Sequence, residues 1–179
     1  MNQLKTSALF ARIDTFELGL CLACNRACHR ERVRQFFAIV SRLGDGVFWY
    51  TLMVLLPLLY GTAALRASVH MAIVAVAGVL LYKFLKSRMV RERPFFQHAD
   101  IALGTAPLDR YSFPSGHTLH AVGFTLVVVS YYPPLAWVVL PFTVLVAASR
   151  VVLGLHYPSD VLAGALLGAG LALASLALL

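Results

Sequence analysis

The chain alternates between long apolar blocks and short polar segments. Five blocks contain no Asp, Glu or Arg, and they are Val47–Leu65, Val69–Leu85, Leu119–Tyr132, Leu135–Ser149 and Val161–Leu179. A helix that crosses the hydrocarbon core of a bilayer needs about 20 apolar residues, and its backbone groups must be paired within the helix. The pattern therefore predicts five transmembrane helices, the third beginning near Ser115 and the fourth reaching Arg150.

Residues 1–46 have a different pattern, in which charges separate apolar residues that recur at helical spacing. These apolar residues are Ala8, Phe10, Ile13, Phe16 and Leu20, and later Val33, Phe36, Phe37 and Val40. Amphipathic helices of this kind lie on a membrane surface more readily than they cross it. We expect an interfacial segment, 1–46, followed by a membrane-embedded domain, 47–179. Gly44 to Gly46 are expected to end the first segment, with Asp45 capping the next helix.

The composition excludes two broad classes of protein. Of 179 residues, 60% are hydrophobic and 13% are charged, and the mean hydropathy is +0.78. Soluble domains contain about 45–50% apolar and about 25% charged residues, so neither an ordinary soluble enzyme nor a disordered chain fits. The net charge is +7, with basic residues beside the apolar blocks. Such placement favours anionic lipid head groups or a phosphate substrate over nucleic acid.

Three cysteines near the N-terminus raise the question of a metal site. Cys21 and Cys24 have the spacing of a zinc ligand pair, and Cys28 is followed by His29. However, no second pair follows, and the same spacing places all three cysteines on one helix face. We interpret them as part of an apolar helix face and expect no metal there.

Counting the predicted spans places three polar clusters on one side of the membrane. The clusters are Lys86–Pro94, Pro114–His117 and Ser149–Asp160. Each follows or precedes a span end on the side that also holds residues 1–46. The sequence thus predicts that three distant segments converge at one end of the bundle.

Cations dominate these clusters. Lys86, Arg93 and Arg150 lie near span ends, where an uncompensated charge is costly. Only Asp160 is an evident acidic partner, so the cations are expected to bind an external anion. The planar fork of arginine and the point charge of lysine both suit phosphate oxygens.

The remaining motif residues supply donors and reactive groups. Ser115 and Gly116 lie at a helix start, where free N–H groups and the helix dipole favour an anion. His156 precedes Asp160 by four residues, so the carboxylate can fix one ring nitrogen and leave the other as a nucleophile. His117 is then the acid that protonates the leaving oxygen. These roles predict in-line attack, a phosphohistidine intermediate and no cofactor.

The three clusters resemble the signature of the type 2 phosphatidic acid phosphatase superfamily, which is Lys-x6-Arg-Pro, Pro-Ser-Gly-His and Ser-Arg-x5-His-x3-Asp. The chain matches this signature without substitution. The resemblance implies a metal-independent membrane phosphatase with His156 as nucleophile, Asp160 as its orienting partner and His117 as acid. It implies a set of phosphate ligands, which are Lys86, Arg93, Ser115, Gly116 and Arg150. Many similar bacterial members have six spans, one more than predicted here.

A site at the ends of spans suits an amphiphile whose tail stays in the bilayer. Similarity to small bacterial members of the family implies hydrolysis of undecaprenyl diphosphate to undecaprenyl phosphate. Phosphatidate or phosphatidylglycerophosphate is the alternative substrate, and a non-catalytic phospholipid-binding or transport protein is a more remote alternative. Binding alone needs no nucleophile and acid, so His117, His156 and Asp160 favour an enzyme.

The basic residues at the ends of the spans bear on which side of the membrane the site faces. The chain is expected in the bacterial cytoplasmic membrane, in an oligomeric state that the sequence does not indicate. The basic residues before the first span outnumber the single Arg66 on the other side, so the positive-inside rule places the site in the cytoplasm. The family resemblance favours the outer face, and both orientations stay open. Arg88 and Arg91 are interpreted as helix-end anchors whose charges reach the head groups.

Overall fold

The structure is a computed structural model that describes residues 2–178, with side chains described for residues 13 and 15–178. Ala8 and Phe10 of the expected apolar face therefore lie outside the described side chains. Within residues 2–178 the chain forms helices and no strand. In chain order the elements are α1 (Asn2–Asn25), η1 (Arg26–His29), α2 (Glu31–Arg42), η2 (Leu43–Val47), α3 (Phe48–Tyr60), η3 (Thr62–Ala64), α4 (Leu65–Arg88), α5 (Pro94–Gln97), α6 (Gly116–Tyr131), η4 (Pro133–Leu135), α7 (Ala136–Val152) and α8 (Pro158–Leu178).

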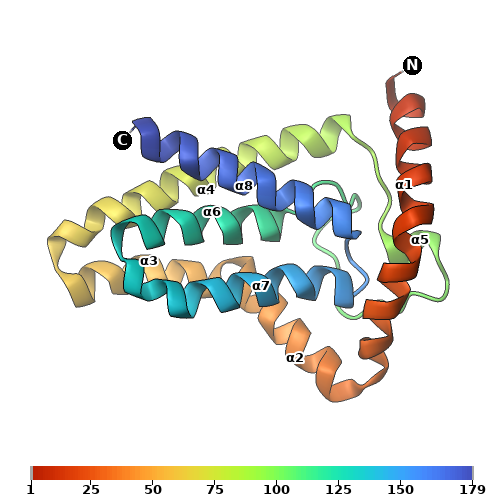
Figure 1. The fold of residues 1–179 in the computed structure, drawn as a ribbon, viewed down its shortest axis with the longest axis horizontal. Coiled ribbons are helices and arrows are strands. Elements are labelled where there is room, and N and C mark those ends of the chain that lie inside the picture. The colour runs from red at the N-terminus through yellow and green to blue at the C-terminus, as the bar shows by residue number, and fades with distance from the viewer. Residues whose placement is uncertain (1, 179) are drawn as a thin grey trace.

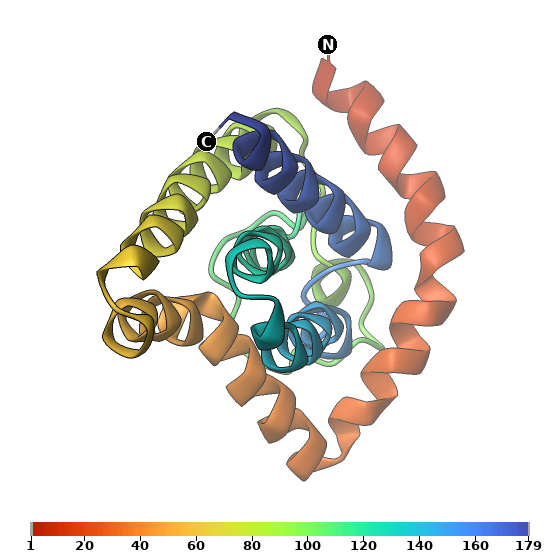
Figure 2. The same cartoon turned by 60° about the vertical axis from the view of Figure 1, so that its left-hand side comes forward.

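The five predicted apolar blocks correspond to α3, α4, α6, α7 and α8. Four helical stretches of the described chain are long and apolar enough to cross a membrane, and they are Glu31–Tyr60, Thr62–Arg88, Pro133–Val152 and Pro158–Leu178. The fifth helix, α6, has 16 residues and runs through the middle of the bundle (Figure 2). The predicted all-α membrane fold is confirmed, with four candidate spans among the described residues where the sequence predicts about five.

The first of these stretches, Glu31–Tyr60, combines α2 with α3, and α3 is the part that corresponds to the first predicted block. α2 and α3 meet at η2, where Gly46 has a φ of 133° and lies outside the helical region of backbone conformation. That region of backbone conformation favours glycine. Because the backbone of Gly46 is not helical, α2 and α3 are two helices that meet at a kink, and the prediction of a break at Gly44 to Gly46 is confirmed. Asp45 forms no capping hydrogen bond within the described chain.

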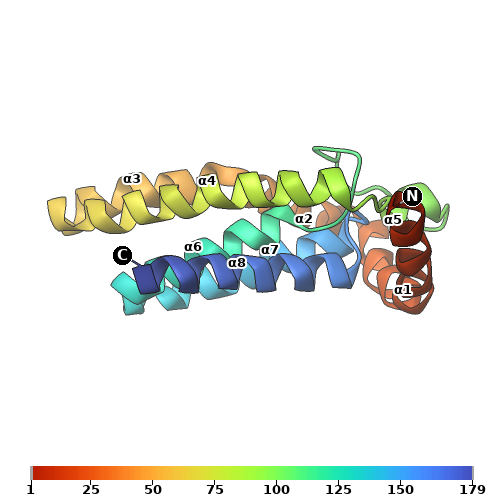
Figure 3. The same ribbon diagram turned by 90° about the horizontal axis from the view of Figure 1, so that it is seen from above.

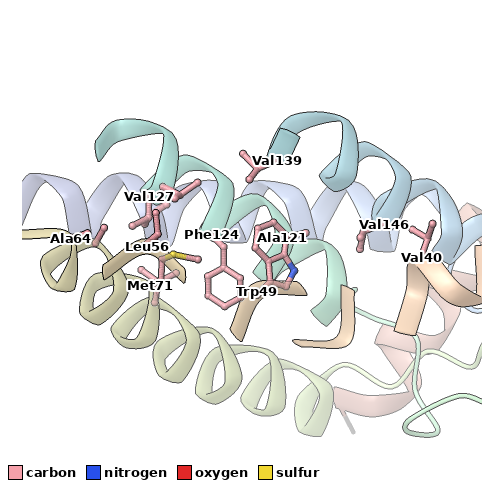
Figure 4. Packing of buried hydrophobic residues seen from close by; sticks show 14 residues of the cluster. Val40, Trp49, Leu56, Ala64, Met71, Ala121, Phe124, Val127, Val139 and Val146 are labelled. Carbon is pink, nitrogen blue, oxygen red and sulfur yellow. The ribbon is translucent and has the colours of Figure 1, made fainter. Parts of the chain in front are cut away.

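The apolar core lies between α6 and the helices around it. Phe124 and Val127 of α6 pack with Trp49 and Leu56 of α3 and with Met71 of α4 (Figure 4). All five side chains are buried. Because lipid is as apolar as these side chains, close packing rather than water exclusion holds such helices together.

Two glycines bring α8 against α6. A Cβ atom on Gly164 would overlap the main-chain oxygen of Ser115, and one on Gly168 would overlap that of Leu119. The two helices therefore touch through their backbones, as the small-xxx-small spacing of these glycines predicts. These two contacts hold the second and third turns of α8 against the start of α6.

The ends of the bundle differ. α1 lies across one end, beside the end of α7 and the start of α8 (Figures 1 and 3). The last turn of α4, the connection from α5 to α6 and the connection from α7 to α8 lie at this same end, whereas the C-terminus lies at the other (Figure 1). The three polar clusters therefore share one end of the molecule, as the count of spans predicts.

Candidate active site

A cavity of about 550 Å³ lies at this end of the bundle, among α3, α4, α6 and α7. Small-molecule sites have volumes of about 300–1,000 Å³. The lining includes residues from all three motifs, which are Lys86, Arg93, Gly116, His117, Arg150 and His156. Segments separated by up to 70 positions in the sequence thus meet around one space.

Lys86 and Arg93 share a carboxylate that belongs to none of the motifs. Lys86 Nζ lies 2.6 Å from Asp109 Oδ2, and Arg93 Nη2 lies 2.7 Å from Asp109 Oδ1. Burial raises the pKa of the Asp109 carboxyl, but the hydrogen bonds and charges of Lys86 and Arg93 outweigh burial and hold it below its ordinary value. The expectation that Asp160 is the evident acidic partner of these cations is therefore wrong, because Asp109 sits as an anion between them.

Arg150 contributes a donor that the protein leaves unused. The side chain is buried in the last turn of α7, and Nη1 donates to Ser41 Oγ of α2. Among the described residues, Arg150 Nε has no hydrogen-bond partner. A buried N–H without a partner is costly, so an anion in the cavity would find a donor ready to bind it.

His156 lies in the connection between α7 and α8 and is buried. Its Nε2 atom is 3.2 Å from Arg93 Nη1, which can only donate, so Nε2 accepts and the ring proton lies on Nδ1. Burial first, and then the charges of Arg93 and Arg150, lower the pKa of His156 well below its ordinary value. The imidazole is therefore neutral and carries a lone pair on the nitrogen that faces the cations.

Asp160 is fully buried in the first turn of α8. Its Oδ2 atom accepts a hydrogen bond from the Tyr157 N–H at 2.9 Å and lies 3.6 Å from His156 Nδ1. Nδ1 itself has no hydrogen-bond partner within the described part of the chain. A movement of less than about 1 Å would close a hydrogen bond between the two residues.

His117 is the second residue of α6 and lines the same cavity as His156. Its Nε2 atom lies 3.4 Å from Asp45 Oδ1. The kink at η2 therefore places the Asp45 carboxylate beside the predicted acid instead of at a helix cap. When His117 is protonated, this carboxylate compensates its charge.

Ser115 and Gly116 differ in their position relative to the cavity. Gly116 lines the cavity, whereas Ser115 is fully buried and its Oγ atom lies 3.0 Å from Thr118 Oγ1. The Ser115 N–H donates to the Asp160 main-chain oxygen at 3.0 Å, so it ties α6 to α8. The first turn of α6 still faces the cavity, where helix N-termini favour anions.

Arg91 is not a surface anchor. Its side chain is completely buried, and its guanidinium lies 2.5 Å from Asp160 Oδ1 and 2.9 Å from Glu17 Oε2. The interpretation of Arg91 as a helix-end anchor is therefore wrong, because its charge faces the protein interior. Neither Arg91 nor Glu17 belongs to a motif, and no periodic pattern marks either residue.

The cysteines pack α1 and η1 against the other helices. Cys28 is buried, and its thiol donates to the Val152 main-chain oxygen at 2.9 Å. Cys21 is also buried, and burial is the main cause that raises its pKa to about 12. The thiol of Cys21 is therefore protonated at neutral pH, which fits a packing face.

Comparison with known families matches residues 67–179 to the PAP2 superfamily. The chain is 33% identical to the undecaprenyl-diphosphatase of Sulfolobus acidocaldarius over 131 residues, which are 72% of this chain and 62% of that protein. It is 31% identical to the undecaprenyl-diphosphatase BcrC of Bacillus subtilis over 114 residues, which are 63% of this chain and 58% of that protein. The chain thus spans less than two thirds of the length of these relatives.

Two solved structures share the fold. The crystal structure of Aquifex aeolicus LpxE matches with a TM-score of 0.79 and 26% identity, covering 90% of this chain and 95% of that one. A transmembrane PAP2-type phosphatidylglycerolphosphate phosphatase from Bacillus subtilis matches with a TM-score of 0.70 and 26% identity, covering 90% of this chain and 85% of that one. In both cases the likeness extends over nearly the whole bundle.

Proposed function

The chain belongs to the PAP2 superfamily, and from this premise we propose that it hydrolyses a lipid diphosphate, first of all undecaprenyl diphosphate to undecaprenyl phosphate. The observation that carries the proposal is that one cavity brings His117 and His156 together with three cations, Lys86, Arg93 and Arg150. The relatives named as undecaprenyl-diphosphatases support this choice of substrate. Phosphatidate or phosphatidylglycerophosphate is the second candidate, favoured by the structural likeness to a phosphatidylglycerolphosphate phosphatase.

The reaction proceeds in two steps. In the first, His156 Nε2 attacks the terminal phosphorus in line, so a P–N bond forms while the P–O bond to undecaprenyl phosphate breaks. His117 gives its proton to the leaving oxygen. In the second step, water attacks the phosphohistidine, His117 takes the proton of the water, and the P–N bond breaks to release inorganic phosphate.

The side chains around the cavity hold the charge that moves during these steps. Lys86, Arg93 and Arg150 bind the non-bridging oxygens, and the N-terminal turn of α6 at Gly116 adds main-chain donors. The hydroxyl of Ser115 joins them only after it turns away from its contact with Thr118.

The cavity and its position suit a substrate that stays in the bilayer. Trp49, Val79 and Phe124 give part of the lining an apolar character, which fits the lipid end of the substrate. We place the protein in the bacterial cytoplasmic membrane. A compartment reporter fused to the C-terminus determines which side the site faces, because the C-terminus and the site lie at opposite ends of the bundle (Figure 1).

The first prediction concerns substrate and metal dependence. We expect the purified protein in detergent to release inorganic phosphate fastest from undecaprenyl diphosphate, more slowly from phosphatidylglycerophosphate and phosphatidate. The rate should be unchanged by EDTA, because side chains supply the positive charge. Binding of these lipids without release of phosphate would instead support the binding or transport protein.

Asp109 forms ion pairs with Lys86 and Arg93, two of the proposed phosphate ligands, and substrate must therefore displace its carboxylate. In Asp109→Asn, substrate no longer displaces a carboxylate from Lys86 and Arg93, so we expect KM to fall about fivefold. That factor corresponds to about 1 kcal/mol, the upper value for an ion pair open to solvent. Initial rates against lipid concentration measure the change.

The control for this variant is Asp100→Asn, which removes the same charge from an exposed position of the same connection. Its KM should equal that of the wild type. A KM that rises in Asp109→Asn would mean that Asp109 orders the two cations for substrate, contrary to the displacement that we propose.

A further inference from the structure

A buried ion cluster behind the cavity joins α1 to α8. Arg91 lies between two carboxylates, with Nη2 at 2.9 Å from Glu17 Oε2 and Nη1 at 2.5 Å from Asp160 Oδ1. The side chains of Arg91 and Asp160 are wholly buried, and that of Glu17 is 11% exposed. The cluster therefore connects the N-terminal helix to a proposed catalytic residue without contact with the cavity itself.

Glu17 also fastens the start of the helix that carries Asp160. Its Oε1 atom accepts a hydrogen bond from the Ser159 N–H at 2.8 Å, and its Oε2 atom accepts one from Ser159 Oγ at 2.8 Å. Arg91 Nη1 donates to the same Ser159 Oγ at 2.7 Å. The first N–H groups of a helix lack partners within the helix and favour a carboxylate, so Glu17 acts as a cap that α1 provides to α8.

The two oxygens of Asp160 have separate contacts. Arg91 holds Oδ1, whereas Oδ2 accepts from the Tyr157 N–H and faces His156 Nδ1. The Arg91 guanidinium also lies over the Tyr157 ring, 4.0 Å from its centroid. Arg91 thus fixes the rotation of the Asp160 carboxylate and the residue that follows His156.

The free energy of burying these charges indicates that the ion cluster of Glu17, Arg91 and Asp160 orients Asp160 more than it stabilises the fold. Desolvation of buried charges costs several kcal/mol for each ion, roughly as much as their attraction returns, and apolar side chains of similar size often stabilise a fold more. A buried cluster of this kind, placed 3.6 Å from the proposed nucleophile, contributes a fixed geometry instead.

We propose that Glu17 and Arg91 are positioning residues that hold Asp160 so that its Oδ2 atom fixes the His156 imidazole for attack. This inference rests on the phosphatase function proposed above. Glu17 lies outside residues 67–179, the part that matches the family, so α1 completes the active site from beyond the family motifs.

The test compares turnover and affinity in variants of the full chain. Glu17→Gln removes the charge but keeps an oxygen for the Ser159 N–H, and we expect kcat to fall about tenfold with KM unchanged, as for partners that orient a reactive residue. Arg91→Met should lower kcat about a hundredfold. Arg91→Lys should lie between wild type and Arg91→Met, because lysine restores the charge without the planar fork.

Two controls separate positioning from general loosening of α1. Glu31→Gln removes a carboxylate from an exposed pair with Arg34 and should leave kcat and melting temperature unchanged. Asn25→Ala removes the side chain that donates to the main-chain oxygens of Ala102 and Val152, so it should lower the melting temperature with kcat near that of the wild type.

The outcomes are distinct. If the wild type releases phosphate but Glu17→Gln keeps full kcat, the inference is overturned and the proposed function stands. The same holds if Asn25→Ala loses as much kcat as Glu17→Gln, since loosening of α1 then explains both. If the wild type releases no phosphate from any lipid of the panel, the proposed function and the inference fall together.

Discussion

Phosphate release is expected to fall at least about a thousandfold when His156 is replaced by alanine, because removal of a nucleophile abolishes the covalent route. The neutral imidazole of His156 carries the lone pair that faces Arg93. Alanine leaves the cations in place, so substrate should still bind while the P–N bond cannot form. Release of inorganic phosphate by the purified variant at saturating lipid diphosphate measures the loss.

A second measurement on the same variant identifies the missing step. Quenching the wild type during turnover of a lipid labelled in its terminal phosphate should leave label on the protein as acid-labile phosphohistidine, and His156→Ala should carry none. His29→Ala, at an exposed position of η1, is the matched control and should retain label and rate. Turnover of His156→Ala within tenfold of the wild type would remove His156 from the role of nucleophile.

The spans could be predicted because the membrane sets their length. Each apolar block is long enough or can be extended by a few residues to cross the hydrocarbon core, and each proves to be a helix. The extension of the third block to Ser115 is close to the observed start of α6 at Gly116. The side on which each polar cluster lies follows from the number of spans alone, which explains why convergence at one end was predictable.

The supporting network of the site could not be predicted, because it depends on how distant segments dock. Glu17 and Arg91 are 74 positions apart, and their contact exists only because α1 lies across the end of the bundle. Asp109 lies in a connection without periodicity, and its contact with Lys86 and Arg93 reflects the path of that connection. A motif names the residues that touch substrate, whereas burial and pairing of their neighbours are tertiary properties.

The bend at η2 shows a related limit. Glycines on both sides of Asp45 predict the break that the structure has, but the cap that the sequence predicts for Asp45 is not formed among the described residues. In the structure, a Cβ on Gly44 would lie 2.7 Å from a methyl carbon of Val146 in α7, so close packing with α7 is one reason for glycine there. The bend places Asp45 beside His117, which only the packed bundle reveals.

Gly164→Ala is expected to impair both stability and catalysis. The new Cβ would overlap the main-chain oxygen of Ser115, which cannot move aside as a flexible side chain does. Overpacking of this kind costs about 1–3 kcal/mol. Because the Ser115 N–H donates to the Asp160 main-chain oxygen, displacement of α8 also moves Asp160, and a misplacement near 1 Å can lower kcat about a hundredfold.

Two other glycines of α8 make this prediction specific. Gly170→Ala places the same methyl group where no described atom lies within 4 Å, so it should leave kcat unchanged and stabilise the helix by up to about 1 kcal/mol. Gly168→Ala meets the Leu119 oxygen one turn farther from Asp160, and it should lower the melting temperature in detergent with a smaller loss of kcat. If Gly164→Ala and Gly168→Ala lower kcat equally, the contact at Ser115 does not position Asp160. Overpacking at either glycine would then displace the whole of α8.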